Sequence, residues 1–96
     1  MTAQYPHVLK TWPDFFDLVR QGKKTCELRR DDRCFVAGDE CVLQEWDPHE
    51  GRATGRTFAI EITHVLYSDP TWGLMDGFVA LSFKPLAAGD PEPTPL

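Results

Sequence analysis

The chain has 96 residues, a length that suits one domain and excludes a two-domain architecture. Hydrophobic residues make up 42% and charged residues 26%, which is ordinary globular composition and excludes a disordered or fibrous protein. The net charge of −5 excludes a uniformly basic nucleic-acid binder. A chain this short buries only roughly 60–65% of its unfolded surface, so we expect a shallow cleft and not a large enclosed cofactor cavity.

The positive charges are unevenly distributed. Residues 20–33 contain six of the ten Lys and Arg residues and three acidic residues, which leaves this segment at +3 and the remainder at −8. A local basic patch on an acidic body can contact phosphate groups. The alternative is a solvated, charged strand edge that opposes aggregation.

The cysteines and the start of the chain favour a reduced, cytoplasmic protein with no membrane partner. Residues 1–6 are too polar for a secretory signal, and no apolar stretch approaches the ~20 residues needed to span a bilayer. The three cysteines are separated by seven and six residues, without the close pairs of structural zinc sites. We therefore expect neither a metal site nor a cofactor, and we assume a monomer.

One short helix is predicted near the start. After a strand-like run at residues 7–10, Thr11 can cap a helix over residues 13–21, and Gly22 suits its C-terminal end. Apolar residues recur at helical spacing and predict one buried helix face. They are Trp12, Phe15, Phe16 and Val19.

The rest of the chain predicts strands, at residues 25–29, 40–46, 57–67 and 78–83. In the long third run, Phe58, Ile60 and Ile62 share a face, and a slip in the alternation predicts a bulge near His64. We expect an α+β, mostly β domain at residues 1–84. Its five or six strands and one helix would form a small β-barrel. The proline-rich residues 85–96 are predicted to be a mobile tail.

The alternation at residues 25–29 predicts the candidate site. Cys26 and Leu28 would point into the core, and Thr25, Glu27 and Arg29 would leave it on the other face. Lys24 precedes them and could reach the same surface. An Arg29 close to Glu27 holds that carboxylate ionised, and a lysine beside a carboxylate is a proton-transfer pair. The alternative is a surface ion-pair row worth ~0–1 kcal/mol.

Other residues have two interpretations each. His7 and Lys10 precede the helix and could join the cleft, or His7 is incidental. Arg33 could meet phosphate, or pair with Asp32 in a turn. Trp46 and Tyr67 could stack on bases or belong to the core. Cys26 is interpreted as a small buried hydrophobic residue.

Gly22, Lys24, Glu27 and Arg29 fit the pattern G-x-K-x-x-E-x-R. This resembles the signature of the ASCH domains, relatives of the PUA RNA-binding domains. With further residues in order over 7–84, the chain is similar to a short bacterial and phage family of ASCH-like proteins of unknown function. The resemblance implies a PUA-like β-barrel, a cleft lined by the motif beside the helix, and an RNA-related role.

One ASCH branch hydrolyses the amide of N4-acetylcytidine. This chain is similar to that branch in having Lys24, but Glu27 stands where the branch has a threonine, so the hydroxyl nucleophile would be missing. Three functions stay open. The favoured one is an RNA- or nucleotide-binding module in which Lys24, Arg29 and Arg33 meet phosphate. The others are a small amidohydrolase acting on a modified nucleoside through Lys24 and Glu27, and a non-enzymatic accessory interaction domain.

Overall fold

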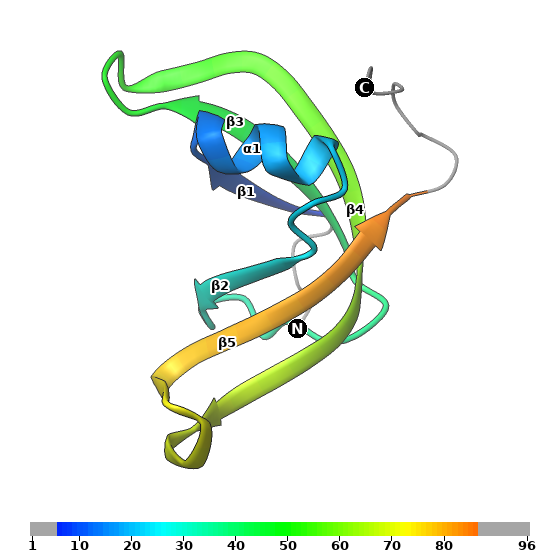
Figure 1. Ribbon diagram of the computed structural model, residues 1–96, viewed down its shortest axis with the longest axis vertical. Helices are drawn as coiled ribbons and strands as arrows, with labels where there is room; N and C mark the ends of the chain where they lie inside the picture. The colour runs from blue at the N-terminus through cyan, green and yellow to red at the C-terminus, as the bar shows by residue number, and fades with distance from the viewer. Residues whose placement is uncertain (1–5, 87–96) are drawn as a thin grey trace.

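The computed structural model describes residues 6–86 and contains one α-helix and five strands (Figure 1). In chain order the elements are β1 (His7–Thr11), α1 (Pro13–Arg20), β2 (Cys26–Arg30), β3 (Glu40–Asp47), β4 (Arg52–Asp69), the 3-10 helix η1 (Pro70–Trp72) and β5 (Leu74–Pro85). Within the described residues, no helix is long and apolar enough to cross a membrane.

The five strands form one sheet in the order β1-β3-β4-β5-β2. β1 runs parallel to β3, and the other neighbours are antiparallel. The α+β, mostly β prediction is confirmed. The sheet is an open one, because β1 and β2 are its two edges and no ladder between them is found in residues 6–86. The helix lies across β1 and β3 in Figure 1, and β2 runs beside β5 at the other end of the sheet.

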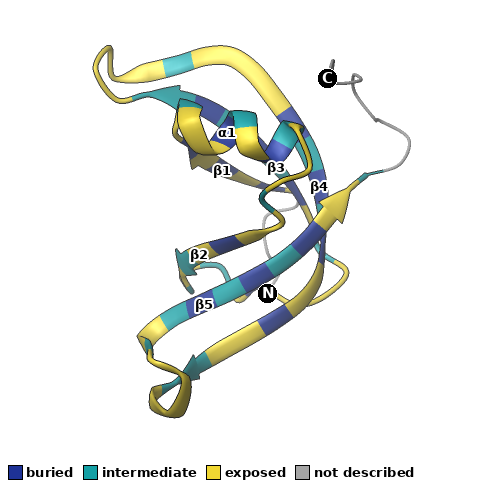
Figure 2. Ribbon diagram, in the orientation of Figure 1, coloured by how far each residue is buried: buried dark blue, intermediate teal, exposed yellow. Residues whose placement is uncertain are grey.

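The core is formed by buried side chains of α1, of the loop before β3 and of four strands, and Figure 2 shows buried positions along the helix and the strands. Phe58, Ile60 and Ile62 are all buried, as predicted. The register between β4 and β5 shifts between Ile62 and His64, and Val65 is buried next. The predicted bulge is therefore confirmed, and it returns the apolar side chains of β4 to the core.

The helix ends follow the prediction at one end only. At the C-terminal end, the N–H groups of Gly22 and Lys23 bond to the carbonyls of Val19 and Leu18, and Gly22 adopts a φ of 77°. These bonds form the Schellman motif that a glycine favours. At the other end the prediction is wrong: Thr11 belongs to β1, where it is buried opposite Glu45, and Trp12 takes the N-cap position without a side-chain hydrogen bond.

The predicted buried helix face is half right. Phe16 and Val19 are buried, but Trp12 is 56% exposed and Phe15 is 48% exposed. Phe15 lies about 100° around the helix from Phe16, and a helix of only two turns covers a narrow strip of the sheet. The exposed rings therefore flank the core and do not enter it.

The strands around β4 are longer than the predicted ranges 40–46, 57–67 and 78–83. β3 extends to Asp47 and β4 begins at Arg52, and β4 and β5 continue to a tip formed by η1 and Gly73. At the end of the described chain, Leu86 donates a backbone hydrogen bond to Ala59. Residues 87–96 of the predicted tail lie outside the described residues.

Candidate functional site

The side chains of β2 point in the opposite sense from the prediction. Glu27 and Arg29 pair with Leu81 and Val79 of β5, whose side chains lie in the core, and directly opposed residues share a face. Glu27 is 9% exposed, whereas Leu28 is 65% exposed. Cys26 is exposed as well, so the expectation that it is buried is wrong. The reason is that polar groups meet the inward face of β2, where Glu27 bonds to Lys24 and Arg29 and where Arg29 bonds to the carbonyl of Lys10 in β1.

Glu27 is held between two cations. Lys24 Nζ donates to Glu27 Oε1 over 2.8 Å, and Arg29 Nε donates to Glu27 Oε2 over 3.2 Å. Lys24 Nζ also donates to the carbonyl of Cys26. The ion pair predicted between Glu27 and Arg29 is confirmed. With 12% of its side chain exposed, Glu27 belongs to a partly buried cluster and not to a solvated surface row.

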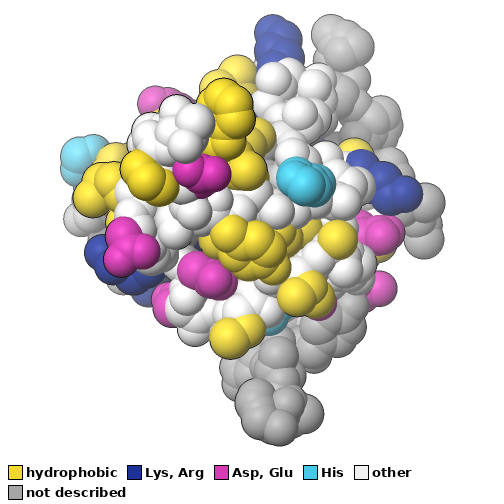
Figure 3. All heavy atoms as spheres, turned by 90° about the horizontal axis from the view of Figure 1, so that it is seen from below, with side chains coloured by type: hydrophobic (Ala, Val, Ile, Leu, Met, Phe, Trp, Pro, Cys, Tyr) yellow, Lys and Arg dark blue, Asp and Glu magenta, His cyan; other side chains and the backbone are white. Residues whose placement is uncertain are grey.

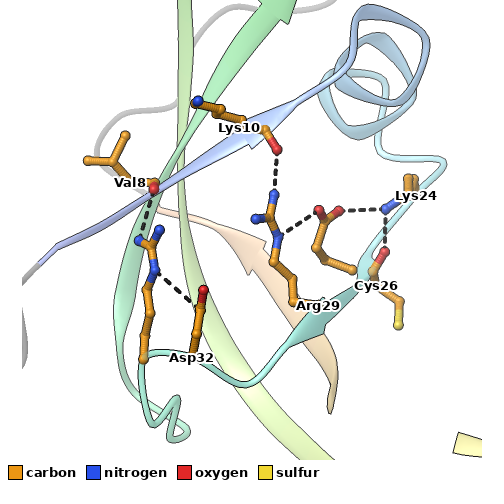
Figure 4. Close-up of polar contacts among 8 residues, drawn as sticks. Val8, Lys10, Lys24, Cys26, Arg29 and Asp32 are labelled. Carbon is orange, nitrogen blue, oxygen red and sulfur yellow. Dashed lines mark hydrogen bonds and ion pairs between the residues drawn. The ribbon is translucent and has the colours of Figure 1, made fainter. Parts of the chain in front are cut away.

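Two arginines link the edges of the sheet (Figure 4). Arg29 Nη2 donates to the carbonyl of Lys10, and Arg33 Nη1 donates to the carbonyl of Val8 over 2.9 Å. Arg33 also lies 3.5 Å from Asp32 Oδ1, so the predicted turn ion pair is present. Val8 and Lys10 are two residues apart, so their carbonyls point to the same edge of β1. Side chains from β2 and the loop after it thus cover the edge that a further strand would pair with.

An aromatic ring lies at each end of this cluster. Lys24 Nζ lies 5.6 Å from the centre of the Phe15 ring, and Lys10 Nζ lies 3.9 Å from the centre of the Trp46 ring. In Figure 4, the Lys10 side chain extends away from the Arg29–Glu27 pair, on the other side of β1. The cluster therefore runs from α1 across the edge of β1 to β3. Of the predicted residues, Lys24, Glu27 and Arg29 contact one another and Arg33 bonds to the same edge of β1, whereas the side chain of Lys10 lies over Trp46 on the other side of β1.

His7 and Tyr67 do not join this cluster. His7 is buried, and its Nε2 lies 3.0 Å from Asp39 Oδ2. The Tyr67 hydroxyl donates to the carbonyl of Phe35 over 2.9 Å, and the His7 ring packs edge-on against the Phe35 ring. Both residues therefore fasten the loop between β2 and β3, a structural role.

A second polar network, formed around the buried Glu45, was not predicted as a site. Arg56 Nε donates to Glu45 Oε1 over 2.9 Å, Thr54 Oγ1 donates to the same oxygen over 2.6 Å, and Arg56 Nη2 reaches Asp17 over 2.7 Å. Burial alone would raise the pKa of Glu45, but the hydrogen bonds from Arg56 and Thr54 outweigh it and hold the pKa below its ordinary value. The alternation of β3 carried the signal, because Glu45 has the parity of the buried Leu43. The network ties α1 to the sheet.

The cysteines differ in chemistry. Burial, reinforced by the nearby charge of Asp39, raises the pKa of the Cys41 thiol to about 11. Cys26 and Cys34 are exposed. Between residues 6 and 86, no three His, Cys, Asp or Glu side chains are grouped so that they could hold a metal ion.

A separate hollow of about 480 Å³ lies at the tip of the β4–β5 hairpin. Figure 3 views the molecule from this side and shows hydrophobic side chains bordered by acidic ones, with Lys and Arg towards the margins. None of the predicted site residues lines this hollow, whose lining is Ser68, Pro70, Gly73, Leu74, Met75 and Asp76. An acidic, apolar face does not suit a phosphate-bearing ligand.

Residues 6–83 match the family described as "Domain of unknown function (DUF3850)". The chain belongs to the DUF3850 family. This DUF3850 domain is also similar to an "Uncharacterized 12.9 kDa protein in GpA 3'region" of Escherichia phage P2, with 42% identity over 59 residues. That match covers 62% of this chain and 52% of the phage protein, so the chain spans about half the length of its curated relative.

Proposed function

We propose that this DUF3850 domain binds RNA or a nucleotide at the gap between β1 and β2. The observation that carries the proposal is the convergence of Lys24, Arg29 and Arg33 on that gap from one short segment. The proposal includes an ASCH-like, PUA-like relationship. It is supported by the position of the motif residues, with Lys24 between α1 and β2 and with Glu27 and Arg29 in β2.

The chemistry of the cluster favours an anionic ligand. A guanidinium has five N–H donors, and the contacts of Arg29 and Arg33 engage only some of them. Glu27 and the carbonyls of β1 hold both arginines in place before a ligand arrives, which reduces the entropy lost on binding. The body of the protein is acidic, so this gap is where phosphate would be attracted.

The test is binding of a fluorescent single-stranded RNA by anisotropy at several salt concentrations. Wild type should bind, and the affinity should fall as salt rises because phosphate contacts release counterions. The Lys24→Ala/Arg29→Ala variant should bind at least tenfold more weakly, with a shallower salt dependence. Lys23→Ala is the matched control, since it removes an exposed adjacent charge outside the cluster. Equal affinity of wild type and the double variant would contradict the proposal.

A second candidate function, a small amidohydrolase acting on a modified nucleoside, is favoured by one distance. Lys24 Nζ and Glu27 Oε1 lie 2.8 Å apart, which suits proton transfer between them. In such a reaction, water would be the nucleophile, because Thr25 is exposed and a glutamate occupies position 27.

Incubation with N4-acetylcytidine tests this candidate. Release of cytidine and acetate, lost in Glu27→Gln, would support hydrolysis. No product at enzyme concentrations near that of the substrate would exclude this activity. If neither nucleosides nor RNA raise the unfolding temperature, the accessory interaction domain is the better account, because ligands of the native state stabilise it.

A further inference from the structure

Building on the proposed function, we propose that the ligand is a single-stranded polynucleotide. It crosses the edge of β1 over the arginines that bond to the carbonyls of this edge, and it stacks one base on Phe15 and another on Trp46. The inference rests on two aromatic rings that lie on different elements, Phe15 in α1 and Trp46 in β3. Each ring lies next to a lysine.

Phe15 has the features of a base-stacking residue. Nearly half of its surface is exposed although it neighbours the buried Phe16, so the ring is presented beside the core. Lys24 Nζ lies 5.6 Å from the ring centre, which places a phosphate-binding cation next to the aromatic surface. Rings alternating with cations are typical of surfaces that bind unpaired bases.

Trp46 provides the second ring. It lies near the end of β3, and Lys10 Nζ is 3.9 Å from its ring centre. Lys10 is exposed, so its ammonium can move from the ring to a phosphate while a base takes its place. Along β1, Leu9 and Thr11 are buried and Lys10 points outward. The side chain of Lys10 is therefore on the opposite side of β1 from that of Arg29 (Figure 4).

Hydrogen bonds lead from Lys24, beside Phe15, to the backbone of Lys10, whose side chain lies over Trp46. Lys24 binds Glu27, Glu27 binds Arg29, and Arg29 binds the carbonyl of Lys10. A backbone that follows this path meets three cations between the two rings. Paired bases in a duplex stack on one another and hide their faces, so a duplex cannot present bases to two rings on opposite sides of a strand. A mononucleotide can occupy only one of them.

The experiment compares four probes with wild type and three variants by anisotropy or competition. The probes are a single-stranded RNA of about 12 nucleotides, the DNA strand of the same sequence, the RNA annealed to its complement, and a mononucleotide. The variants are Phe15→Leu, Trp46→Leu and, as the matched control, Trp72→Leu, which removes a 70% exposed ring at the hairpin tip. Thermal unfolding of each variant establishes that it is folded.

Wild type should bind the single strand most tightly and the duplex and mononucleotide at least tenfold more weakly. Phe15→Leu and Trp46→Leu should each weaken single-strand binding by about 5- to 150-fold, with an unchanged salt dependence. Trp72→Leu should bind as wild type does. Binding of the DNA strand tests whether the protein distinguishes ribose from deoxyribose. Equal affinity for the DNA and RNA strands means that stacking and phosphate contacts suffice.

Single-strand affinity unchanged in both Phe15→Leu and Trp46→Leu would overturn the inference, as would duplex binding as tight as single-strand binding. If these results occur while Lys24→Ala/Arg29→Ala still abolishes binding, the proposed function survives and this inference alone fails. If a variant proves unfolded, Phe15→Tyr or Trp46→Phe replaces it. These variants keep a ring and should bind within about threefold of wild type, and a greater loss would count against stacking.

Discussion

Arg29 of β2 donates a hydrogen bond to the carbonyl of Lys10 in β1, so a side chain joins the two edge strands of the sheet. The same guanidinium holds Glu27 through its Nε. One residue therefore links β2 to β1 and also contacts the Glu27 carboxylate. This double role makes Arg29 important for stability as well as for ligand binding.

Removing the Arg29 guanidinium should destabilise the fold. In Arg29→Met, the partly buried Glu27 carboxylate keeps only Lys24 of its two cations, and a lost partner of a buried polar group costs about 1–3 kcal/mol. For a domain of this size that corresponds to a lowering of the unfolding temperature by about 4–8 °C per kcal/mol. Thermal unfolding followed by circular dichroism measures it. Arg30→Met, in which an exposed neighbouring arginine is replaced, is the control, and equal loss in both would refute the special role of Arg29.

The orientation of β2 can be tested with two leucines in adjacent strands. Leu81→Ala should cost about 2–5 kcal/mol of unfolding free energy, because Leu81 is buried in the core. Leu28→Ala should cost no more than about 0.5 kcal/mol, because that side chain is largely exposed. Urea denaturation gives both values. Similar large losses would mean that Leu28 faces the core, as the sequence alone suggests.

The contrast between β2 and β4 shows what the sequence pattern can predict. In β4, Phe58, Ile60 and Ile62 face a hydrophobic core, so apolar parity identified the buried face and even the bulge near His64. In β2, the same rule selected the wrong face. The inward face of β2 carries the charged Glu27 and Arg29 in place of apolar residues, and the partners of Glu27 are its neighbours in sequence, Lys24 and Arg29. Alternating residues predict that a strand is present, but packing against the rest of the fold decides which of its two faces is buried.

Thiol reactivity should separate the three cysteines. At pH 8 the thiol of Cys41, with a pKa of about 11, is almost entirely protonated and is also buried, whereas Cys26 and Cys34 are exposed. Titration with a chromogenic disulfide should detect two fast-reacting thiols per folded chain and the third only after unfolding. Mass spectrometry of the labelled peptides assigns them. Fast labelling of Cys41 in the native protein would contradict the described packing.

Stability should depend on pH through Glu45. Its pKa is lower in the folded protein than in the unfolded chain, so ionised Glu45 stabilises the fold. This contribution is fully present above the unfolded pKa of about 4.3 and is lost as the pH falls through the lower folded value. Unfolding temperatures measured from about pH 3 to about pH 7 should therefore rise with pH at the acidic end.

Replacing Arg56 should reduce or reverse that dependence. In Arg56→Gln, Glu45 loses the charged hydrogen bonds that outweigh the effect of its burial. The pKa of Glu45 should therefore rise, and the folded state should favour its protonated form. We expect a loss of about 1–3 kcal/mol near neutral pH, which shrinks as the pH is lowered. Arg52→Gln, at the exposed start of β4, is the control. An unchanged pH profile in Arg56→Gln would show that Glu45 is held by other groups.

The candidate site was predictable in part. The spacing of Glu27 and Arg29 was sufficient to predict their contact, because residues two apart on a strand share a face, and the position of Lys24 before the strand allowed it to reach the same carboxylate. The contributions of Phe15 and of the carbonyls of Val8 and Lys10 were not predictable. They depend on how far a short helix covers the sheet and on which two strands become its edges. His7 was placed in the cleft by sequence proximity, but its pairing with Asp39 buries it.

The most direct test of the account is a nuclear magnetic resonance titration of the isotopically labelled protein with a short single-stranded RNA. We predict that the largest shifts of backbone amides fall at Lys10, Phe15, Lys24, Arg29 and Trp46, around the edge of β1. Shifts confined to the β4–β5 hairpin tip, or no shifts at a concentration that saturates a nucleic-acid-binding module, would contradict the proposal that this gap is the binding site.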